Sequence, residues 1–456
     1  MLQIKNIIDL VKGFRFIIES LDLKSSLGRR HLLSLPFITD PKILVSEFNT
    51  IADFINADSD IIDTISIKLS QIRDIQGTIK NLNNAATLDD IELFEIKHFS
   101  LLACEIKKLL EKLKIKTIVL PYLDELVNIL DPEKQRLAHF YIYSLYSDEL
   151  ASLRHKYNMQ KEEKSELAEA TRLKSIEKED EIRQRLSIQL FEYANSLFVA
   201  LEQIAYLDVV IAKAKLAETL NLCKPKIASD TSIYKSLFNP QVKEILQKEN
   251  KQFQAIDITL YRSPCLITGA NMGGKTVLLK TVALAQYMFQ FGFYIPAAKA
   301  DIVPVDLVML SMSDEQSELN GLSSYAAEIL NLNDIINAIK SDKKVLVLID
   351  ELARTTNPEE GKAIVNATLD IFEIYKVRSL ITSHYSGLKT NCRKLKVKGL
   401  DLKTIKDIIT VENINKFMDY SLEENKLDEK SNEALNIAKI LGVDNELILN
   451  AEKYLC

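Results

Sequence analysis

The sequence predicts an all-helical first half followed by a mixed α/β domain with a mostly parallel sheet. Residues 1–223 are almost free of glycine, and their apolar residues recur at helical spacing. After residue 241, helical segments alternate with short apolar runs of the kind that form buried strands, at 265–268, 305–310, 345–350 and 379–382. Such alternation is typical of a parallel sheet with helices packed on it.

Four segments follow from this pattern in a chain of 456 residues. Residues 1–223 are expected to form the helical domain, 224–241 a linker with proline and short polar residues, 242–430 the α/β domain, and 431–456 a helical tail. Within the first domain, the run 150–190 mixes charges of both signs and contains few aromatic residues. It favours two long antiparallel helices that project as an arm, although a merely solvated helical face has the same pattern.

The composition is that of a cytoplasmic protein. Hydrophobic residues make up 47% of the chain and charged residues 27%, and no apolar run approaches the length of a membrane span. The N-terminus has no signal-peptide pattern, and the five cysteines show no paired spacing, so we expect reduced thiols. A net charge of −6 provides no overall basic field for nucleic acid, but a local basic groove is compatible with it.

The segment 269–276 reads G-x-x-x-x-G-K-T, between a predicted strand and a predicted helix. Backbone N–H groups of such a glycine-rich turn and the N-terminus of the next helix bind phosphate together. In this pattern Lys275 reaches the outer phosphates of a nucleotide, and the Thr276 hydroxyl binds Mg²⁺. The other residues of the expected phosphate loop are Gly269, Ala270, Asn271, Met272, Gly273 and Gly274.

Two further predicted strands end in polar residues suited to nucleotide chemistry. Asp350 and Glu351 follow the apolar run 345–349, so Asp350 is expected to hold Mg²⁺ through water and Glu351 to orient or deprotonate the attacking water. A surface acidic pair is the alternative. His384 follows the run 380–382, and a neighbouring strand would place it at the γ-phosphate, although a lone histidine is often only structural.

A serine pair opens the next predicted helix. Ser323 and Ser324 precede the apolar run, and helix capping alone would explain them. Alternatively, Ser323 and the helix N-terminus bind the γ-phosphate of a nucleotide held by another subunit, which would make hydrolysis depend on a dimer.

In their order and spacing these motifs resemble the ATPase domain of the MutS family, a branch of the ABC-type ATPases. The phosphate loop is similar to the family's T-G-P-N-M-G-G-K-S/T, with Ala270 in place of proline. Residues 350–356 resemble D-E-x-G-R-G-T, 383–385 resemble T-H-Y, and 323–328 resemble S-T-F-x-x-E. The resemblance implies ATP and Mg²⁺ as cofactors, a homodimer with composite sites, and Phe253 stacked on adenine.

The first half resembles the family's core and lever domains more loosely, over residues 23–33 and 204–214, with 150–190 as a short clamp. Because the chain begins within the core-like segment, we expect the mismatch-reading and connector domains to be absent. The segments 353–358 and 418–422 resemble a small subgroup of MutS-like ATPases. Some members of that subgroup are associated with reactivating cobalamin-dependent lysine or ornithine aminomutases.

The resemblance leaves two client molecules open. The first is DNA, clamped by the helical arms through shape and phosphate contacts, as in mismatch-repair ATPases. The alternative is a protein, a cobalamin-dependent aminomutase that the chain would reactivate. The short arm, the acidic net charge and the expected lack of a mismatch reader favour the protein client, whereas the general behaviour of the family favours DNA. No membrane partner is expected.

Overall fold

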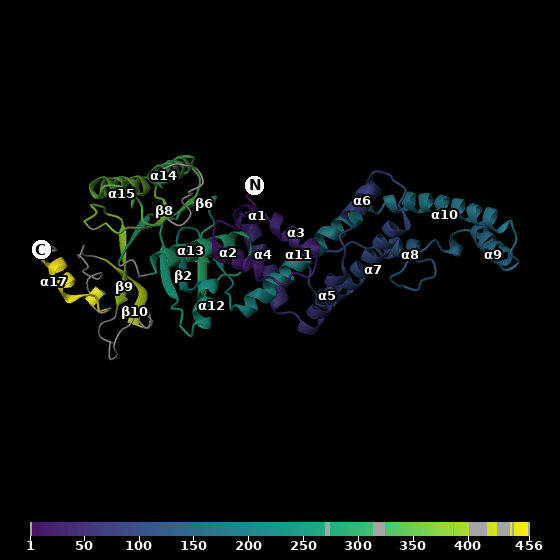
Figure 1. Cartoon of the computed structure of the whole chain (residues 1–456), viewed down its shortest axis with the longest axis horizontal. Helices are drawn as coiled ribbons and strands as arrows, with labels where there is room; N and C mark the ends of the chain where they lie inside the picture. Colours follow the sequence, from purple (N-terminus) through teal and green to yellow (C-terminus); the bar gives the residue numbers. More distant parts are fainter. Residues whose placement is uncertain are drawn as a thin grey trace. The chain divides into compact units, whose positions relative to one another are not determined.

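The computed structural model describes residues 2–269, 274–312, 324–354, 356–385, 387–400, 417–425, 438–439 and 442–454 (Figure 1). The chain divides into two compact units, one helical and one containing the sheets. The helical unit comprises residues 22–35 and 50–215, and the sheet-containing unit comprises 1–21, 36–49 and 216–456. This division differs from the predicted boundary at residue 223, because two N-terminal segments pack with the α/β part.

The helical unit contains no strand in its residues, all of which the structure describes. Its helices are α3 (Ser26–Ser34), α5 (Ser59–Gln71), α6 (Gln76–Asn83), α7 (Asp90–Lys112), α8 (Asp124–Leu130), η1 (Ser144–Tyr146), α9 (Asp148–Glu162) and α10 (Ala168–Phe191). Helices α4 (Pro41–Ile55) and α11 (Ala194–Thr219) contribute residues to both units. Among the described residues, no helix combines the length and the apolar character that crossing a membrane requires.

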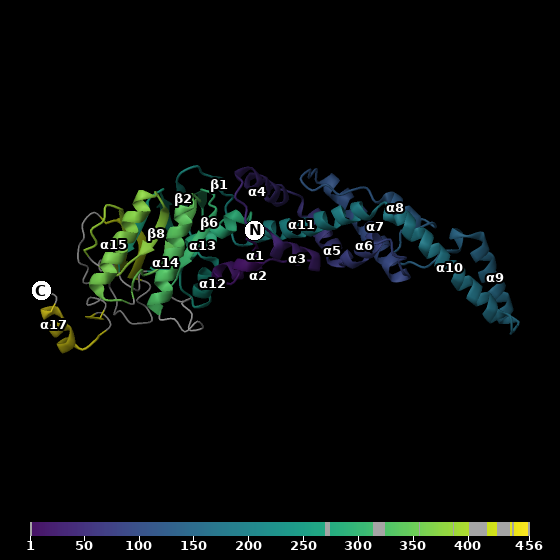
Figure 2. The same cartoon turned by 90° about the horizontal axis from the view of Figure 1, so that it is seen from above.

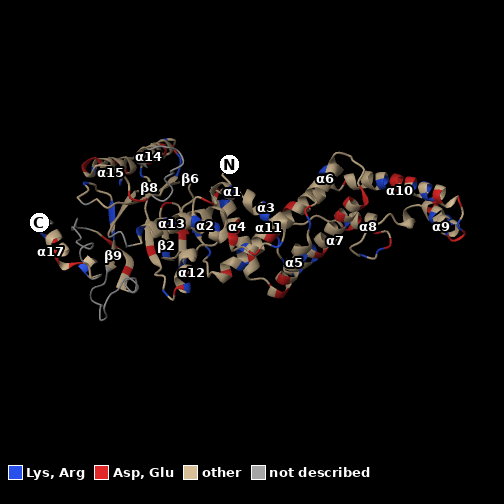
Figure 3. Ribbon diagram, viewed as in Figure 1, with Lys and Arg blue, Asp and Glu red and all other residues tan. Residues whose placement is uncertain are grey.

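Helices α9 and α10 form the antiparallel pair that the charge-mixed run predicts. Residues near the start of α9 pair with the middle of α10, through Glu149 and Lys178, whereas Gln160 near its end accepts a hydrogen bond from Thr171 near the start of α10. Lysine, arginine and acidic side chains alternate along α10 (Figure 3). The interleaving gives the pair many local ion pairs, each of which contributes little in water.

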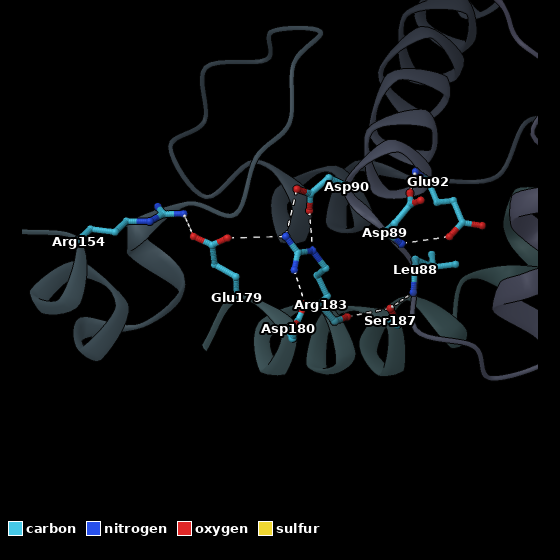
Figure 4. A network of polar contacts seen from close by, with 9 residues as sticks. All are labelled: Leu88, Asp89, Asp90, Glu92, Arg154, Glu179, Asp180, Arg183 and Ser187. Carbon is cyan, nitrogen blue, oxygen red and sulfur yellow. Dashed lines mark hydrogen bonds and ion pairs between the residues drawn. The ribbon is translucent and has the colours of Figure 1, made fainter. Parts of the chain in front are cut away.

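Arg183 connects this helix pair to the start of α7 (Figure 4). Its guanidinium donates to both carboxylate oxygens of Asp90, at 2.8 and 3.2 Å, and to Asp180 at 2.5 Å. Close by, the Ser187 hydroxyl accepts the backbone N–H of Leu88 at 2.9 Å. These contacts join the middle of α10 to the N-terminus of α7, where an acidic side chain also suits the helix dipole.

The sheet-containing unit has a six-stranded sheet in the order β10-β9-β4-β8-β7-β6. Every neighbouring pair is parallel except β10 and β9, which agrees with the predicted mostly parallel sheet. Its strands are β4 (Pro264–Thr268), β6 (Leu307–Ser311), β7 (Val345–Ile349), β8 (Arg378–Thr382), β9 (Arg393–Leu400) and β10 (Met418–Glu424). Helix α17 (Asn445–Lys453) lies in the predicted C-terminal tail.

Helices cover both faces of this sheet. Alternate residues of β7, namely Val345, Val347 and Ile349, pack in one apolar cluster with helices α14 (Ser324–Lys340) and α15 (Pro358–Ile374). These two helices lie side by side on that face (Figures 1 and 2). Helix α13 (Lys275–Gln290) also packs on β7 and β8 but contributes nothing to that cluster, so it covers the other face. Burial on both faces explains the uninterrupted apolar sequence of β7.

A second, four-stranded sheet takes two of its strands from the segment predicted as a linker. Its order is β1-β5-β2-β3, with β1 (Lys226–Ile227), β2 (Ser232–Leu237), β3 (Ile256–Leu260) and β5 (Lys299–Ile302). Helix α12 (Pro240–Lys248) connects β2 to β3. The interpretation of 224–241 as a linker therefore differs from the structure, because β2 is short and half polar and only its pairing partners identify it as a strand.

The N-terminal segments pack on helix α13. Phe14 of α2 (Lys12–Glu19) lies between the rings of Tyr287, Phe291 and Phe293, with centroid distances of 5.7 to 6.4 Å. The short helix α1 (Ile4–Ile7) precedes it, and Ile38 donates its backbone N–H to Gln290 at 2.8 Å. These contacts join residues more than 250 positions apart, which no local sequence pattern reveals.

Candidate functional site

The sheet order brings the predicted site residues to one edge. Strands β4, β8 and β7 are neighbours and parallel, so their carboxyl ends lie together. The expected phosphate loop follows β4, Asp350 and Glu351 follow β7, and His384 follows β8. In open α/β sheets ligands bind at this edge.

Asp350 forms hydrogen bonds with residues that follow or belong to three different strands and helices at this edge of the sheet. It is 5% exposed, and its two carboxylate oxygens accept hydrogen bonds from different hydroxyls, Thr276 on Oδ2 and Thr382 on Oδ1, each at 2.7 Å. Its backbone N–H donates to the carbonyl of Ser311 in β6 at 2.8 Å. A hydroxyl and a carboxylate held this close are the hard oxygen ligands that suit Mg²⁺, which keeps several of its waters. Thr276 and Asp350 therefore fit the metal role that the sequence predicts.

The start of α13 shows the backbone geometry that a phosphate loop needs. Gly269 and Gly274 have φ angles of +127° and +72°, which glycine adopts at little cost. Lys275 is 3% exposed, and its ammonium donates to the Gly269 carbonyl at 2.7 Å, so the charge lies against the first residue of the loop. Ala270, Asn271, Met272 and Gly273 lie outside the described residues.

Glu351 has an unusual backbone conformation beside this centre. Its φ is +54°, and Ala353 two residues later has a φ of +60°, a region that costs non-glycine residues about 1 kcal/mol or more. The Glu351 N–H donates to the Thr382 hydroxyl at 2.8 Å, which offsets part of that cost. Its carboxylate pairs with Arg354 at 2.9 Å, and because Arg354 is 60% exposed, the pair is weak.

A buried group of side chains supports the segment that follows Glu351. The Tyr385 hydroxyl donates to the Ala353 carbonyl at 2.6 Å, and the Ala353 N–H donates to the Glu328 carboxylate. A side chain at Gly361 would overlap the Tyr385 hydroxyl, so glycine is required there by space. Burial, with the nearby charge of Glu328, raises the pKa of Tyr385, which therefore stays a hydrogen-bond donor.

The environment of His384 favours its neutral form. Partial burial lowers its pKa, the charge of Lys275 lowers it further, and the charge of Glu351 opposes the shift. Because His384 follows the carboxyl end of β8, it lies at the same edge of the sheet. Its ring lies 4.2 Å from that of Tyr385, centroid to centroid.

Phe253 lies half-buried in the segment before β3. The next residue, Gln254, donates to Asp419 of β10 at 2.8 Å and accepts the Tyr420 N–H at 2.8 Å. Burial alone would raise the pKa of Asp419, but hydrogen bonds from Gln254 and Ser421 hold it well below its usual range. A Cβ built on Gly274 would lie 3.2 Å from the Tyr420 ring, so this aromatic side chain borders the start of α13.

Sequence reasoning did not find Thr382, Gln254 or Tyr420. Thr382 ends an apolar strand, and Gln254 and Tyr420 are joined by a long-range hydrogen bond between the segment before β3 and strand β10 that the sequence did not predict. The segment 418–422 resembles a subgroup of MutS-like ATPases, but this resemblance assigned no function to any residue of the segment. Ser323 lies outside the described residues, and α14 begins at Ser324.

The fold and this edge define an α/β protein whose parallel strands end in a lysine, a hydroxyl, two carboxylates and a histidine. Residues 265–456 match the family model of MutS domain V, the ATPase domain of the MutS family. This part of the chain is therefore similar to the ATPase domain of the MutS family.

Three relatives illustrate the similarity. Endonuclease MutS2 of Finegoldia magna is 32% identical over 290 residues, which cover 62% of this chain and 35% of that protein. Endonuclease MutS2 of Thermus thermophilus is 35% identical over 221 residues, 48% of this chain and 28% of that protein. Putative endonuclease MutS2 of Bacillus subtilis is 35% identical over 223 residues, 48% and 27%. The matched part of the chain thus spans roughly a third of the length of these relatives or less.

Proposed function

We propose that this chain binds and hydrolyses ATP with Mg²⁺ as a homodimer and uses the nucleotide state to clamp DNA. The observation that carries the proposal is the Asp350 carboxylate, which joins the Thr276 hydroxyl of α13 to the end of β8. ATP would lie on residues 269–276, with Phe253 and Tyr420 near its base.

Each residue then has a chemical task. Thr276 and Asp350 would hold Mg²⁺, which would neutralise charge on the outer phosphates. Lys275 contacts the same phosphates after leaving the Gly269 carbonyl. Glu351 accepts the proton of the attacking water once it has left Arg354, and neutral His384 donates a hydrogen bond to the γ-phosphate.

The dimer and the clamp rest on the family. Relatives in the MutS family act as dimers on DNA, and in such a dimer Ser323 of one copy would complete the ATP site of the other. Helices α9 and α10 would form the arm that contacts DNA. The alternative client, a cobalamin-dependent aminomutase, gains no support from the relatives named above.

Two variants test the ATP site. Lys275→Ala is expected to weaken ATP binding by about 100-fold, or about 2.8 kcal/mol, because the phosphates lose their buried cation. Glu351→Gln is expected to bind ATP normally and to hydrolyse it about 10² to 10⁴ times more slowly. Two exposed residues serve as matched controls: Lys248→Ala, at the end of α12, and Glu249→Gln, directly after it. Unchanged ATP affinity in Lys275→Ala, or wild-type turnover in Glu351→Gln, would contradict the assignment.

A salt titration tests the DNA client. Affinity for duplex DNA should fall steeply with salt, because binding releases counterions from the phosphates. Lys174 of α10 is exposed and, within the fully described helical unit, has no ion pair, whereas Lys178 pairs with Glu149 and Glu181. Lys174→Gln should therefore reduce the salt slope by about one, and Lys178→Gln should change it little. No DNA binding at low salt would exclude the clamp while leaving the ATP site untouched.

A further inference from the structure

A cavity of about 340 Å³ lies in the sheet-containing unit, away from the candidate ATP site. It includes the first residue of β7, Val345, and the first residue of β8, Arg378. Asp350 follows the opposite end of β7, and a five-residue strand spans about 16 Å. The cavity and the ATP site therefore lie at opposite edges of the same sheet.

The cavity carries an excess of positive charge. Its lining includes five cationic side chains, Arg262, Lys343, Lys344, Lys376 and Arg378, and two acidic ones, Asp230 and Asp342. The structure shows no ion pair for any of the five cations among the residues that it describes. Helices α14 and α15 end next to the cavity, and their C-termini contribute about half a negative charge each. Counting the lining side chains and these two helix ends, an excess of about two positive charges remains.

The positive charge of Arg378 is energetically unfavourable where this residue lies. It is 7% exposed, and one of its terminal nitrogens donates to the backbone carbonyl of Asp230, but its Nε has no hydrogen-bond partner among the described residues. Burial lowers its pKa, and the neighbouring charge of Arg262 also lowers it, against the opposing effects of Tyr234 and Asp230. A buried guanidinium that forms no ion pair among the described residues is unfavourable unless an anion binds to it.

We propose that this cavity binds a dianionic phosphate group, carried by a free nucleotide or by the 5′ end of a DNA strand. Arginine binds phosphate with paired, directional hydrogen bonds, and two negative charges match the excess charge of the cavity. The volume is that of a small-molecule site. Arg378 is recessed, so a terminal phosphate reaches it and a phosphate inside a duplex backbone does not. Tyr375 at the edge of the cavity is 46% exposed and offers an aromatic face to a base.

Equilibrium dialysis of the full chain against radiolabelled inorganic phosphate tests the site. The Lys275→Ala background removes phosphate binding at the ATP site, so the result does not depend on the proposed ATPase. In that background one phosphate per chain should still bind, and Arg378→Gln should weaken its binding by at least about tenfold. Lys343→Gln with Lys376→Gln, both exposed, should weaken it several-fold without affecting folding, which circular dichroism checks. Lys248→Gln, outside the cavity, should change nothing.

Competition then identifies the source of the phosphate. Displacement of the label by adenosine monophosphate, but not by oligonucleotides, supports a free nucleotide. Displacement by a 5′-phosphorylated oligonucleotide, but not by its 5′-hydroxyl counterpart, supports a DNA end. The proposal is overturned if phosphate binding disappears with Lys275→Ala alone, if the paired lysine variant binds like the control, or if neither competitor displaces the label.

Discussion

Thr382 is the buried residue on which the candidate site depends most directly, and Thr382→Val tests this dependence. The side chain is 0% exposed at the end of β8. Its hydroxyl donates to Asp350 Oδ1 at 2.7 Å and accepts the Glu351 N–H at 2.8 Å. Valine has nearly the same shape, so the substitution removes these two hydrogen bonds and leaves the packing almost unchanged.

The expected loss of stability follows from the two partners left behind. A hydrogen bond to a charged group contributes about 1.5 to 3 kcal/mol, and one to a backbone N–H contributes about 0.5 to 1.5 kcal/mol. The free energy of unfolding should therefore fall by about 2 to 4.5 kcal/mol. Because Glu351 already has a positive φ, losing the acceptor for its N–H should also displace its carboxylate and lower the rate of ATP hydrolysis by at least about tenfold, or about 1.4 kcal/mol.

Thr368→Val is the matched control. Thr368 is 2% exposed on α15, and its hydroxyl only donates to the Ile364 carbonyl at 2.8 Å, an acceptor that the helix ladder can also satisfy. Urea unfolding measures stability, and steady-state hydrolysis measures kcat as Mg²⁺ is varied. Thr382→Ser keeps the hydroxyl and should restore most of the kcat. Equal effects of Thr382→Val and Thr368→Val would refute the reasoning, because the hydroxyl of Thr382 would then have no special role.

Two further predictions concern other buried polar groups. Lys97→Met should destabilise the helical unit by about 3 to 5 kcal/mol, because the Asp131 carboxylate, 1% exposed, loses the ammonium that lies 3.0 Å from it. Calorimetry of the double variant Lys97→Met/Asp131→Asn should show that part of this stability returns. Burial would raise the pKa of Asp131, but hydrogen bonds from the Arg136 backbone and from Lys97 lower this pKa overall. The ionised Asp131 carboxylate therefore stabilises the fold above about pH 4, and this stabilisation is lost as the pH falls through the lowered pKa. A wild-type unfolding free energy that does not decrease below pH 4 would contradict this. Tyr385→Phe should lower the free energy of unfolding by about 1 kcal/mol and reduce kcat more than ATP affinity, because the Ala353 carbonyl loses its hydrogen-bond donor. Equal losses in the control variant Tyr261→Phe, at an exposed tyrosine, would contradict this prediction.

The parts of the site that the sequence revealed are those with local signals. The phosphate-loop pattern and the acidic pair after an apolar strand each lie within ten consecutive residues. The parallel sheet then explains why segments about a hundred residues apart share one edge. Thr382 gave no such signal, because a threonine inside an apolar strand is typical of a packed strand and only its distance to Asp350 reveals its role.

The domain limits could not be predicted in the same way. Residues 1–21 and 36–49 have the helical periodicity of their neighbours, and β2 looks like a polar linker. Their assignment depends on contacts with α13, β3 and β5, which are long-range in the chain. The conformational propensity of a local segment contains no information about such contacts.

By itself, the sequence indicated the classes of secondary structure, a phosphate-loop pattern and the chemical types at the strand ends, because hydrophobic period and motif spacing are local properties. Only the tertiary structure decided which N-terminal segments join the sheet-containing unit, which threonine holds Asp350, and where five cations that form no ion pair among the described residues converge on one cavity. Burial and charge compensation depend on neighbours in space, and these neighbours are separated by up to hundreds of residues in the chain.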